Sequence, residues 1–134
     1  MRINFPEEIK KHVAERARFV CEYCRYAEKY GYNSFHIEHI RPLKHNGSSE
    51  IDNLAYSCPP CNSAKGSNIG TYLDSSTRFT RLFNPRIDVW RDHFEMIDGV
   101  VQSKSDVGAA TTLILNMNNL TRILERRRIE MLER

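Results

Sequence analysis

The four cysteines of the sequence form two matched pairs, and this arrangement constrains the fold more than any other feature. Two residues separate the cysteines within each pair, and 33 residues separate the pairs. A Cys-x2-Cys turn can direct both of its sulfurs toward one tetrahedral ion, so two such turns can complete a four-sulfur site. The wide gap indicates a folded insert between them. The pairs are Cys21 with Cys24 and Cys58 with Cys61.

Zinc is the ion that this ligand set favours. No histidine is among the ligands and no position is left open, so the predicted zinc is structural rather than catalytic. The alternatives are a redox-active pair and buried free thiols. A thiol-disulfide oxidoreductase would need its Cys-x2-Cys turn between a strand and a helix of a thioredoxin-like fold, which the sequence does not indicate. Zinc explains all four cysteines at once.

Composition and charge predict an ordinary globular domain. The 134 residues are 40% hydrophobic and 28% charged. No apolar run reaches the ~20 residues that cross a bilayer, and the start lacks the apolar core of a signal peptide, so a cytoplasmic location without membrane contact is expected. In that compartment thiols stay reduced and Cys-x2-Cys pairs bind metal more often than they form disulfides. The net charge of +3 falls to about +1 with a four-thiolate zinc, so global charge is a weak indicator of nucleic-acid binding.

The periodicity of apolar residues predicts an α+β fold in one domain. The domain spans 1–134, with a core of about 19–75 and a C-terminal extension of about 76–134. Asn46-Gly47 and Asp98-Gly99 are turn pairs that tolerate positive φ. We expect helices over 6–19, 106–117 and 119–133, a helix starting after Cys61 within 62–73, strands over 35–40 and 54–57, and a short hairpin over 94–101.

The polar residues between the cysteine pairs identify a family resemblance. The segments are CEYC, FHIEHIRPLKHNGSSEIDNLAYSC and CNSAKG, and together they resemble the HNH endonuclease family. The stretch LFNPRIDVWRDHFEMIDGVVQS is similar to the C-terminal part of a bacterial subfamily. The resemblance implies a ββα-metal, treble-clef-like core with a structural zinc, an N-terminal helix, and a C-terminal hairpin and helices. It also implies metal-dependent hydrolysis of phosphodiester bonds in DNA.

The resemblance assigns roles to four residues. His39 matches the first motif residue, Asn53 the second, and Asn62 the place where many members have a final His. Glu38 stands where an acidic residue, often Asp, precedes the catalytic His. Glu38 and Asn62 are therefore expected to hold one catalytic cation. Their oxygens suit Mg²⁺ or Mn²⁺, and Ni²⁺ or Co²⁺ stay open.

The chemistry of phosphodiester hydrolysis explains these residue types. A neutral His can take the proton of the attacking water, so His39 is the expected general base, and Asn53 is expected to fix its orientation. Strand alternation sends Glu38 and His39 to opposite faces unless the strand bends, and Pro42 makes a bend there plausible. Three auxiliary residues have open roles: His36 in phosphate or outer-shell metal contact or in packing, His45 in DNA backbone contact, and Lys65 in phosphate contact or as a solvated side chain.

A different class of function competes with the enzyme. A non-catalytic zinc-ribbon module that binds nucleic acid would need only the four cysteines, but it leaves Glu38, His39, Asn53 and Asn62 unexplained. The expected partner of the enzyme is DNA, bound mainly through its phosphates, whereas the non-catalytic module could bind nucleic acid or protein. The sequence leaves open the cleavage specificity, nicking against double-strand cutting, the preferred catalytic metal, the oligomeric state and the biological role.

Overall fold

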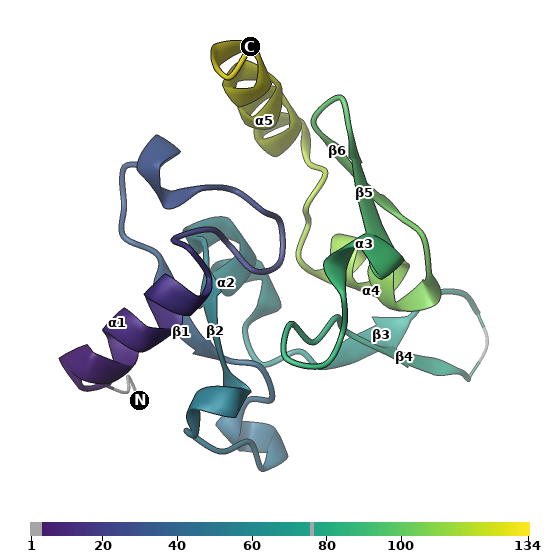
Figure 1. Ribbon diagram of the computed structural model, residues 1–134. Coiled ribbons are helices and arrows are strands. Elements are labelled where there is room, and N and C mark those ends of the chain that lie inside the picture. The colour runs from purple at the N-terminus through teal and green to yellow at the C-terminus, as the bar shows by residue number, and fades with distance from the viewer. Residues whose placement is uncertain (1–3, 76) are drawn as a thin grey trace.

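Short helices and three separate two-stranded sheets make up the part of the chain that the structure describes. A computed structural model describes residues 4–75 and 77–134 of the chain. Figure 1 shows α1, the first hairpin and α2 on one side and the later elements on the other. The elements are α1 (Glu7–Arg16), β1 (His36–His39), β2 (Leu54–Ser57), α2 (Pro59–Lys65), β3 (Gly70–Tyr72), β4 (Phe79–Arg81), α3 (Trp90–His93), β5 (Phe94–Ile97), β6 (Val100–Ser103), α4 (Asp106–Ile114) and α5 (Leu120–Leu132).

One hydrophobic core joins the two halves of the chain. It contains the four cysteines and side chains from both sides of Figure 1. Burial of such apolar side chains is the main favourable contribution to folding. The halves therefore stabilise one another rather than folding around separate cores. The larger side chains of this hydrophobic core include Val13, Tyr23, Leu54, Phe83, Phe94, Leu115 and Met117.

The first hairpin confirms the strands predicted over 35–40 and 54–57. β1 pairs antiparallel with β2, from His36 opposite Ser57 to His39 opposite Leu54. All four residues of β2 are buried. Helix α1 contacts both strands, and α2 contacts β1. The hairpin is thus a platform held between two helices.

The loop that links β1 to β2 turns sharply at the predicted Asn-Gly pair. Asn46 has a left-handed backbone with φ 65°. Gly47 is required for a different reason, because a Cβ there would lie 1.6 Å from the carbonyl oxygen of Arg41. Two short 3₁₀ helices, Leu43–His45 and Ile51–Asn53, flank this turn. The close packing brings residues 48–53 back to the end of β1.

The helix after the second cysteine pair starts earlier and ends sooner than the sequence suggested. α2 begins directly after Cys58, whose sulfur accepts a hydrogen bond from the backbone N–H of Cys61 at 3.4 Å. Gly66 ends the helix with φ 50°. The later part of the run 62–73, in which the helix was expected to start, is not helical, because Gly70–Tyr72 pairs with β4. Long-range pairing overrides the local helical pattern there.

The C-terminal hairpin and helices follow the prediction closely. β5 and β6 are joined by Asp98 and Gly99, whose φ values of 50° and 79° suit a two-residue hairpin turn. α4 and α5 fall within the ranges expected for two helices. Ser105 caps α4 and Asn119 caps α5, each through a side-chain oxygen that accepts a backbone N–H. Local sequence signals are sufficient to predict these elements.

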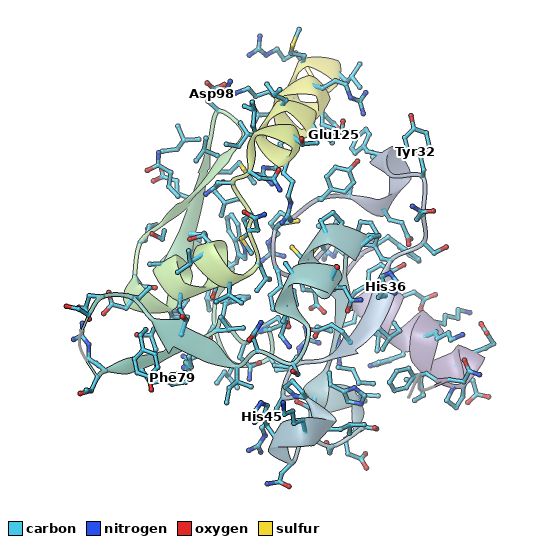
Figure 2. The ribbon with its side chains drawn as sticks, turned by 180° about the vertical axis from the view of Figure 1, so that it is seen from behind. Tyr32, His36, His45, Phe79, Asp98 and Glu125 are labelled. Atoms are coloured by element: carbon cyan, nitrogen blue, oxygen red, sulfur yellow. The ribbon has the colours of Figure 1, made fainter. Side chains whose placement is uncertain are left out.

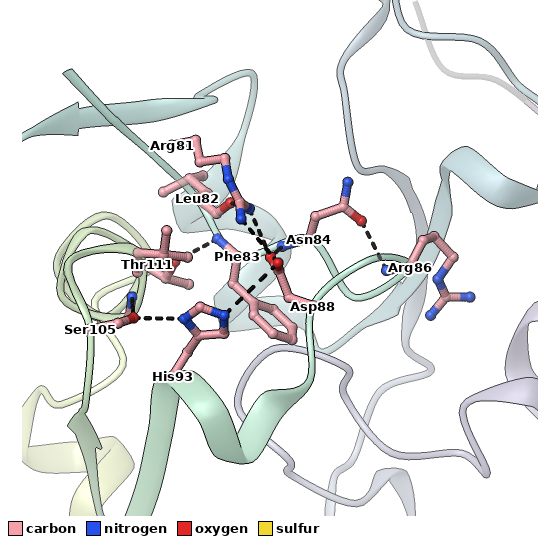
Figure 3. Close-up of polar contacts among 11 residues, drawn as sticks. Arg81, Leu82, Phe83, Asn84, Arg86, Asp88, His93, Ser105 and Thr111 are labelled. Atoms are coloured by element: carbon pink, nitrogen blue, oxygen red, sulfur yellow. Dashed lines mark hydrogen bonds and ion pairs between the residues drawn. The ribbon is translucent and has the colours of Figure 1, made fainter.

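A carboxylate holds the connection between β4 and α3 in place (Figure 3). Asp88 accepts hydrogen bonds from both terminal nitrogens of Arg81, at 2.7 and 3.0 Å, and from the backbone N–H of Asn84 at 2.9 Å. The bond from Arg81 lowers the pKa of Asp88. Nearby, the backbone N–H of Phe83 donates to the hydroxyl of Thr111 at 2.8 Å. These bonds fasten the segment after β4 to α4.

Helix α5 turns arginines, not leucines, toward the protein. Arg126 is 7% exposed and donates to the carbonyl oxygens of Gly99 and Met117, each at 2.6 Å. These carbonyl oxygens need hydrogen-bond donors, and Arg126 supplies them. Among the described residues, no helix has both the length and the apolar character that spanning a membrane requires. The exposed apolar residues of α5 include Leu120, Leu124 and Met131.

Candidate metal centre and candidate active site

The four cysteines converge on one buried point. Their sulfur atoms all lie within 4.8 Å of one another, and none of the four residues is more than 2% exposed. The sulfurs of Cys24 and Cys58, which come from different pairs, are 3.6 Å apart. In the first pair, the backbone N–H of Cys24 points at the sulfur of Cys21 at 3.5 Å. The fold therefore brings the two pairs together as their spacing predicted.

The geometry of this cluster fits a tetrahedral zinc ion. Zn–S bonds of about 2.3 Å place the sulfurs of a tetrahedral site roughly 3.8 Å apart. The 3.6 Å separation of Cys24 and Cys58 and the 4.8 Å limit for the whole set are close to that value. All four thiols are free of disulfides. The cluster suggests a structural zinc site that is enclosed by the protein.

Residues of the C-terminal extension contact both cysteine pairs. Arg86 forms an ion pair with Glu22, and the indole N–H of Trp90 donates to the carbonyl oxygen of Tyr23 at 2.8 Å. Glu22 and Tyr23 lie between the two cysteines of the first pair. At the second pair, Nη2 of Arg122 lies 2.9 Å from the sulfur of Cys61. The extension is therefore part of the metal centre's surroundings.

His39 occupies the last position of β1 and is half-buried. Its Nε2 lies 3.0 Å from the hydroxyl oxygen of Ser49, and its ring packs near Phe5 with centroids 5.6 Å apart. Partial burial, and then the positive charge of Lys65, lower the pKa of His39 below its ordinary value. The neutral form of the imidazole is therefore favoured at pH 7. In this form His39 can accept a proton.

Asn53 connects the end of β1 to the loop that carries Ser49. Its side-chain oxygen accepts the backbone N–H of Arg41 at 2.9 Å, and its side-chain nitrogen donates to the carbonyl oxygens of Arg41 and Ser48 at 2.9 and 2.7 Å. Its own carbonyl oxygen accepts the N–H of Ile40 at 2.8 Å. These four hydrogen bonds of Asn53, together with the one from its backbone N–H to the carbonyl oxygen of Glu50 at 2.8 Å, hold the backbone on both sides of the His39–Ser49 contact.

Glu38 points to the opposite face of the hairpin and is 8% exposed. One carboxylate oxygen accepts the hydroxyl of Tyr23, and the other lies 3.0 Å from Nζ of Lys65. Lys65 also donates to the carbonyl oxygens of His39 and Ile40, each at 3.0 Å. Burial raises the pKa of Glu38, although Lys65 and Tyr23 act in the other direction. The ion pair links Lys65 of α2 to Glu38 of β1. Removing either partner would leave the other buried charge without compensation, which is strongly unfavourable.

The structure does not bring Glu38 and His39 into one site. β1 stays regular, with Glu38 opposite Ala55 and His39 opposite Leu54, so the bend expected before Pro42 does not occur between them. Both oxygens of Glu38 are occupied, and in this arrangement Glu38 does not fit as a ligand of a divalent cation. Neither role considered for Lys65, contact with a DNA phosphate or a solvated side chain, fits the structure, because its side chain is 2% exposed and bound inside the protein.

The remaining candidate residues are Asn62, His45 and His36. Asn62 is half-buried in α2, and its side-chain amide has no hydrogen-bond partner among the described residues. His45 approaches the carbonyl oxygen of Ser67, with Nε2 at 3.2 Å. His36 lies at the start of β1, beside a depression that Lys10 also lines. Figure 2 shows His36 and His45 at well-separated places, so they do not form one cluster with each other.

Several residues of these sites carry no local sequence signal. Ser49 lies in a polar loop, and Tyr23 is an aromatic residue between two cysteines. Arg122 is one of several arginines in the last helix. Their partners are 10, 15 and 61 residues away in the chain. Only the folded arrangement identifies them, because pairing at such distances depends on which face of each element is buried.

Comparison with known proteins supports the family resemblance. Residues 21–68 match the model of the HNH endonuclease family. The matched segment contains all four cysteines together with Glu38, His39, Asn53 and Asn62. The resemblance inferred from the sequence is thereby confirmed over these residues, and an HNH segment points to a nuclease. No curated protein and no solved structure gave a match to the chain.

Proposed function

We propose that the chain is an endonuclease that hydrolyses phosphodiester bonds in DNA, with His39 as its general base. The observation that carries the proposal is the state of His39, which is half-exposed, oriented by Ser49 and inside the HNH segment. Hydrolysis requires a water whose proton is removed as it attacks phosphorus. A neutral imidazole near the surface can take that proton, and the lowered pKa keeps His39 neutral.

Ser49 and Asn53 act on the base indirectly in this proposal. The contact between Ser49 and Nε2 fixes the rotation of the imidazole ring, and Phe5 limits its movement by packing against it. Asn53 holds the strand end and the 48–53 loop together. Because the base must point at one water, loss of either support would weaken proton transfer without removing the base.

A catalytic divalent cation also belongs to the proposal, by resemblance to the family. When bound, Mg²⁺ or Mn²⁺, or alternatively Ni²⁺ or Co²⁺, would polarise the scissile phosphate and stabilise the leaving oxygen. Asn62 keeps a side-chain oxygen without a partner in the described residues, which suits a hard cation. Glu38 could join it only after Lys65 and Tyr23 release its carboxylate. Proton transfer to His39 does not require the carboxylate of Glu38 to be released from Lys65 and Tyr23.

DNA is the proposed substrate and is held mainly through its phosphates. Arg41 and Lys44 are exposed on the loop between β1 and β2, next to the Asn53 hydrogen bonds. Cationic side chains there can contact the backbone of either strand without reading its sequence. We include in the same proposal a ββα-metal, treble-clef-like core, a single domain with its core at about 19–75, and a cytoplasmic location.

Plasmid nicking tests the proposed function directly. The zinc-loaded protein, desalted without chelator, should convert supercoiled plasmid to nicked or linear forms only after a divalent cation is added. Mg²⁺, Mn²⁺, Ni²⁺ and Co²⁺ are titrated separately. A His39→Ala preparation, purified in parallel, controls for contaminating nucleases. A folded protein that binds plasmid but cuts it with none of the four cations would instead identify a non-catalytic zinc-ribbon module.

The pH dependence of cleavage should reflect the lowered pKa of His39. We expect kcat/KM to rise with pH along a limb centred below about 6.5 and then to reach a plateau, because protonated His39 cannot accept a proton. Rates are measured between about pH 5 and 8 at constant ionic strength, with circular dichroism at each pH as the control for folding. A limb centred above pH 7 would contradict the assignment of His39 as the base.

A further inference from the structure

A guanidinium group from the last helix reaches the cysteine cluster. Nη2 of Arg122 lies 2.9 Å from the sulfur of Cys61 and 3.9 Å from that of Cys58. Nη1 of the same group donates to the carbonyl oxygens of Leu115 and Asn116, at 2.7 and 3.1 Å. The carbonyls hold one edge of the planar group, so the other edge is directed at the sulfurs before any ion arrives.

The contact between Arg122 and the cysteine sulfurs matters because the metal-loaded cluster would be negatively charged. A zinc ion bound by four thiolates carries a net charge of about −2, and the four cysteines are almost completely buried. A buried negative charge is unfavourable unless a positive group or hydrogen-bond donors compensate it. Among the described residues, Arg122 is the basic side chain with nitrogen atoms at hydrogen-bond distance from the sulfurs. The positive charge of its guanidinium therefore lies directly beside the sulfurs that would carry the negative charge.

We propose that Arg122 is a positioning residue of the metal centre, which retains zinc by donating a hydrogen bond to the Cys61 thiolate and offsetting the charge of the cluster. The hydrogen bond orients the sulfur toward the ion and offsets part of the negative charge of the thiolate. Arg122 lies outside residues 21–68, so zinc retention depends on a part of the chain that the HNH segment does not include. The proposal does not require nuclease activity.

The chain offers two matched control arginines on the same helix. Arg126 anchors α5 through the carbonyls of Gly99 and Met117 but has no hydrogen bond to sulfur. Arg128 is exposed and pairs with Glu125 one turn away. Arg126→Gln therefore measures the effect of loosening the helix, and Arg128→Gln measures the loss of a surface charge. Arg122→Gln removes the charge beside the sulfurs, and Arg122→Lys keeps it.

Zinc release from the full-length protein is the first measurement. A metallochromic chelator in excess reports the rate, with circular dichroism recorded before its addition. We expect Arg122→Gln to release zinc about 10- to 100-fold faster than wild type, the usual range for an outer-shell partner of a metal ligand. Arg122→Lys should recover at least half of that change on a logarithmic scale. Arg126→Gln and Arg128→Gln should stay within about threefold of wild type.

Equal release from Arg122→Gln and Arg126→Gln would overturn the proposal, since anchoring of α5 alone would then explain the effect. A wild-type rate for Arg122→Gln would overturn it as well. If Arg122→Gln does not fold, wild-type protein loaded with ¹¹³Cd provides the second measurement. A guanidinium proton of Arg122 should show a scalar coupling to cadmium through the N–H···S hydrogen bond. Absence of that coupling, with couplings from the backbone N–H groups of Cys24 and Cys61 present, also rejects the proposal.

Discussion

Replacing His39 with alanine is expected to reduce DNA cleavage by about 10² to 10⁴-fold, the usual contribution of a positioned general base. The protein should remain folded, because His39 is only half-buried and its hydrogen bond to Ser49 lies at the surface. It should also keep its zinc, since the cysteine cluster makes no hydrogen bond to this side chain. Nicking rates at saturating cation, together with zinc content, measure both effects.

Two other histidines provide matched controls for that experiment. His12 is exposed on α1, outside the HNH segment, and His12→Ala should cut at the wild-type rate within about twofold. His36 lies on the strand of His39 but on the other face. If His36→Ala loses activity while folded His39→Ala cuts normally, the base has been assigned to the wrong face of the hairpin.

Replacing Cys58 with serine is expected to abolish folding of the soluble protein. A structural zinc contributes on the order of 10 kcal/mol in small domains, and the whole stability of a domain is only about 5–15 kcal/mol. Cys58 also accepts the hydrogen bond that caps α2, so its loss affects the helix as well as the metal. The measurements are solubility, the thermal unfolding transition and zinc per chain, which should be one in the wild type.

The control for this experiment is a serine on the same helix. Ser63 is exposed on α2, two residues after Cys61, and Ser63→Ala should unfold within a few degrees of wild type. Chelation of the wild type should produce the same unfolded state as Cys58→Ser. A purified wild type that stays fully folded after its metal has been removed would reject the structural zinc.

Sequence patterns were sufficient where the determining interactions are local. The two Cys-x2-Cys turns, the strands beside them and the Asp98-Gly99 hairpin follow from spacing, alternation and turn chemistry within a few residues. The family resemblance then placed His39 and Asn53 in the HNH segment. Their actual hydrogen bonds, to Ser49 and to the backbone of Arg41, needed the folded loop.

The failures share a physical cause. Glu38 looked like an open metal ligand, because the sequence cannot show that Lys65, 27 residues later, turns inward and meets it. The sequence also cannot show that Arg122 and Arg126 of α5 turn inward and donate to the carbonyl oxygens of Leu115 and Gly99. In both cases a buried polar group forms its hydrogen bonds with an element that is distant in the sequence. Which element that is depends on the tertiary structure.

Arg86 and Trp90 contact residues of the first cysteine pair, so the HNH segment of residues 21–68 depends on contacts from outside itself. In a fragment that stops near residue 75, the carboxylate of Glu22 would keep its bond to the backbone N–H of Tyr56 but would lose its cationic partner. The carbonyl oxygen of Tyr23 would lose the indole donor. A chimaera built by grafting residues 21–68 alone onto another protein would therefore need substitutes for both groups, and the smallest portable unit extends at least through Trp90.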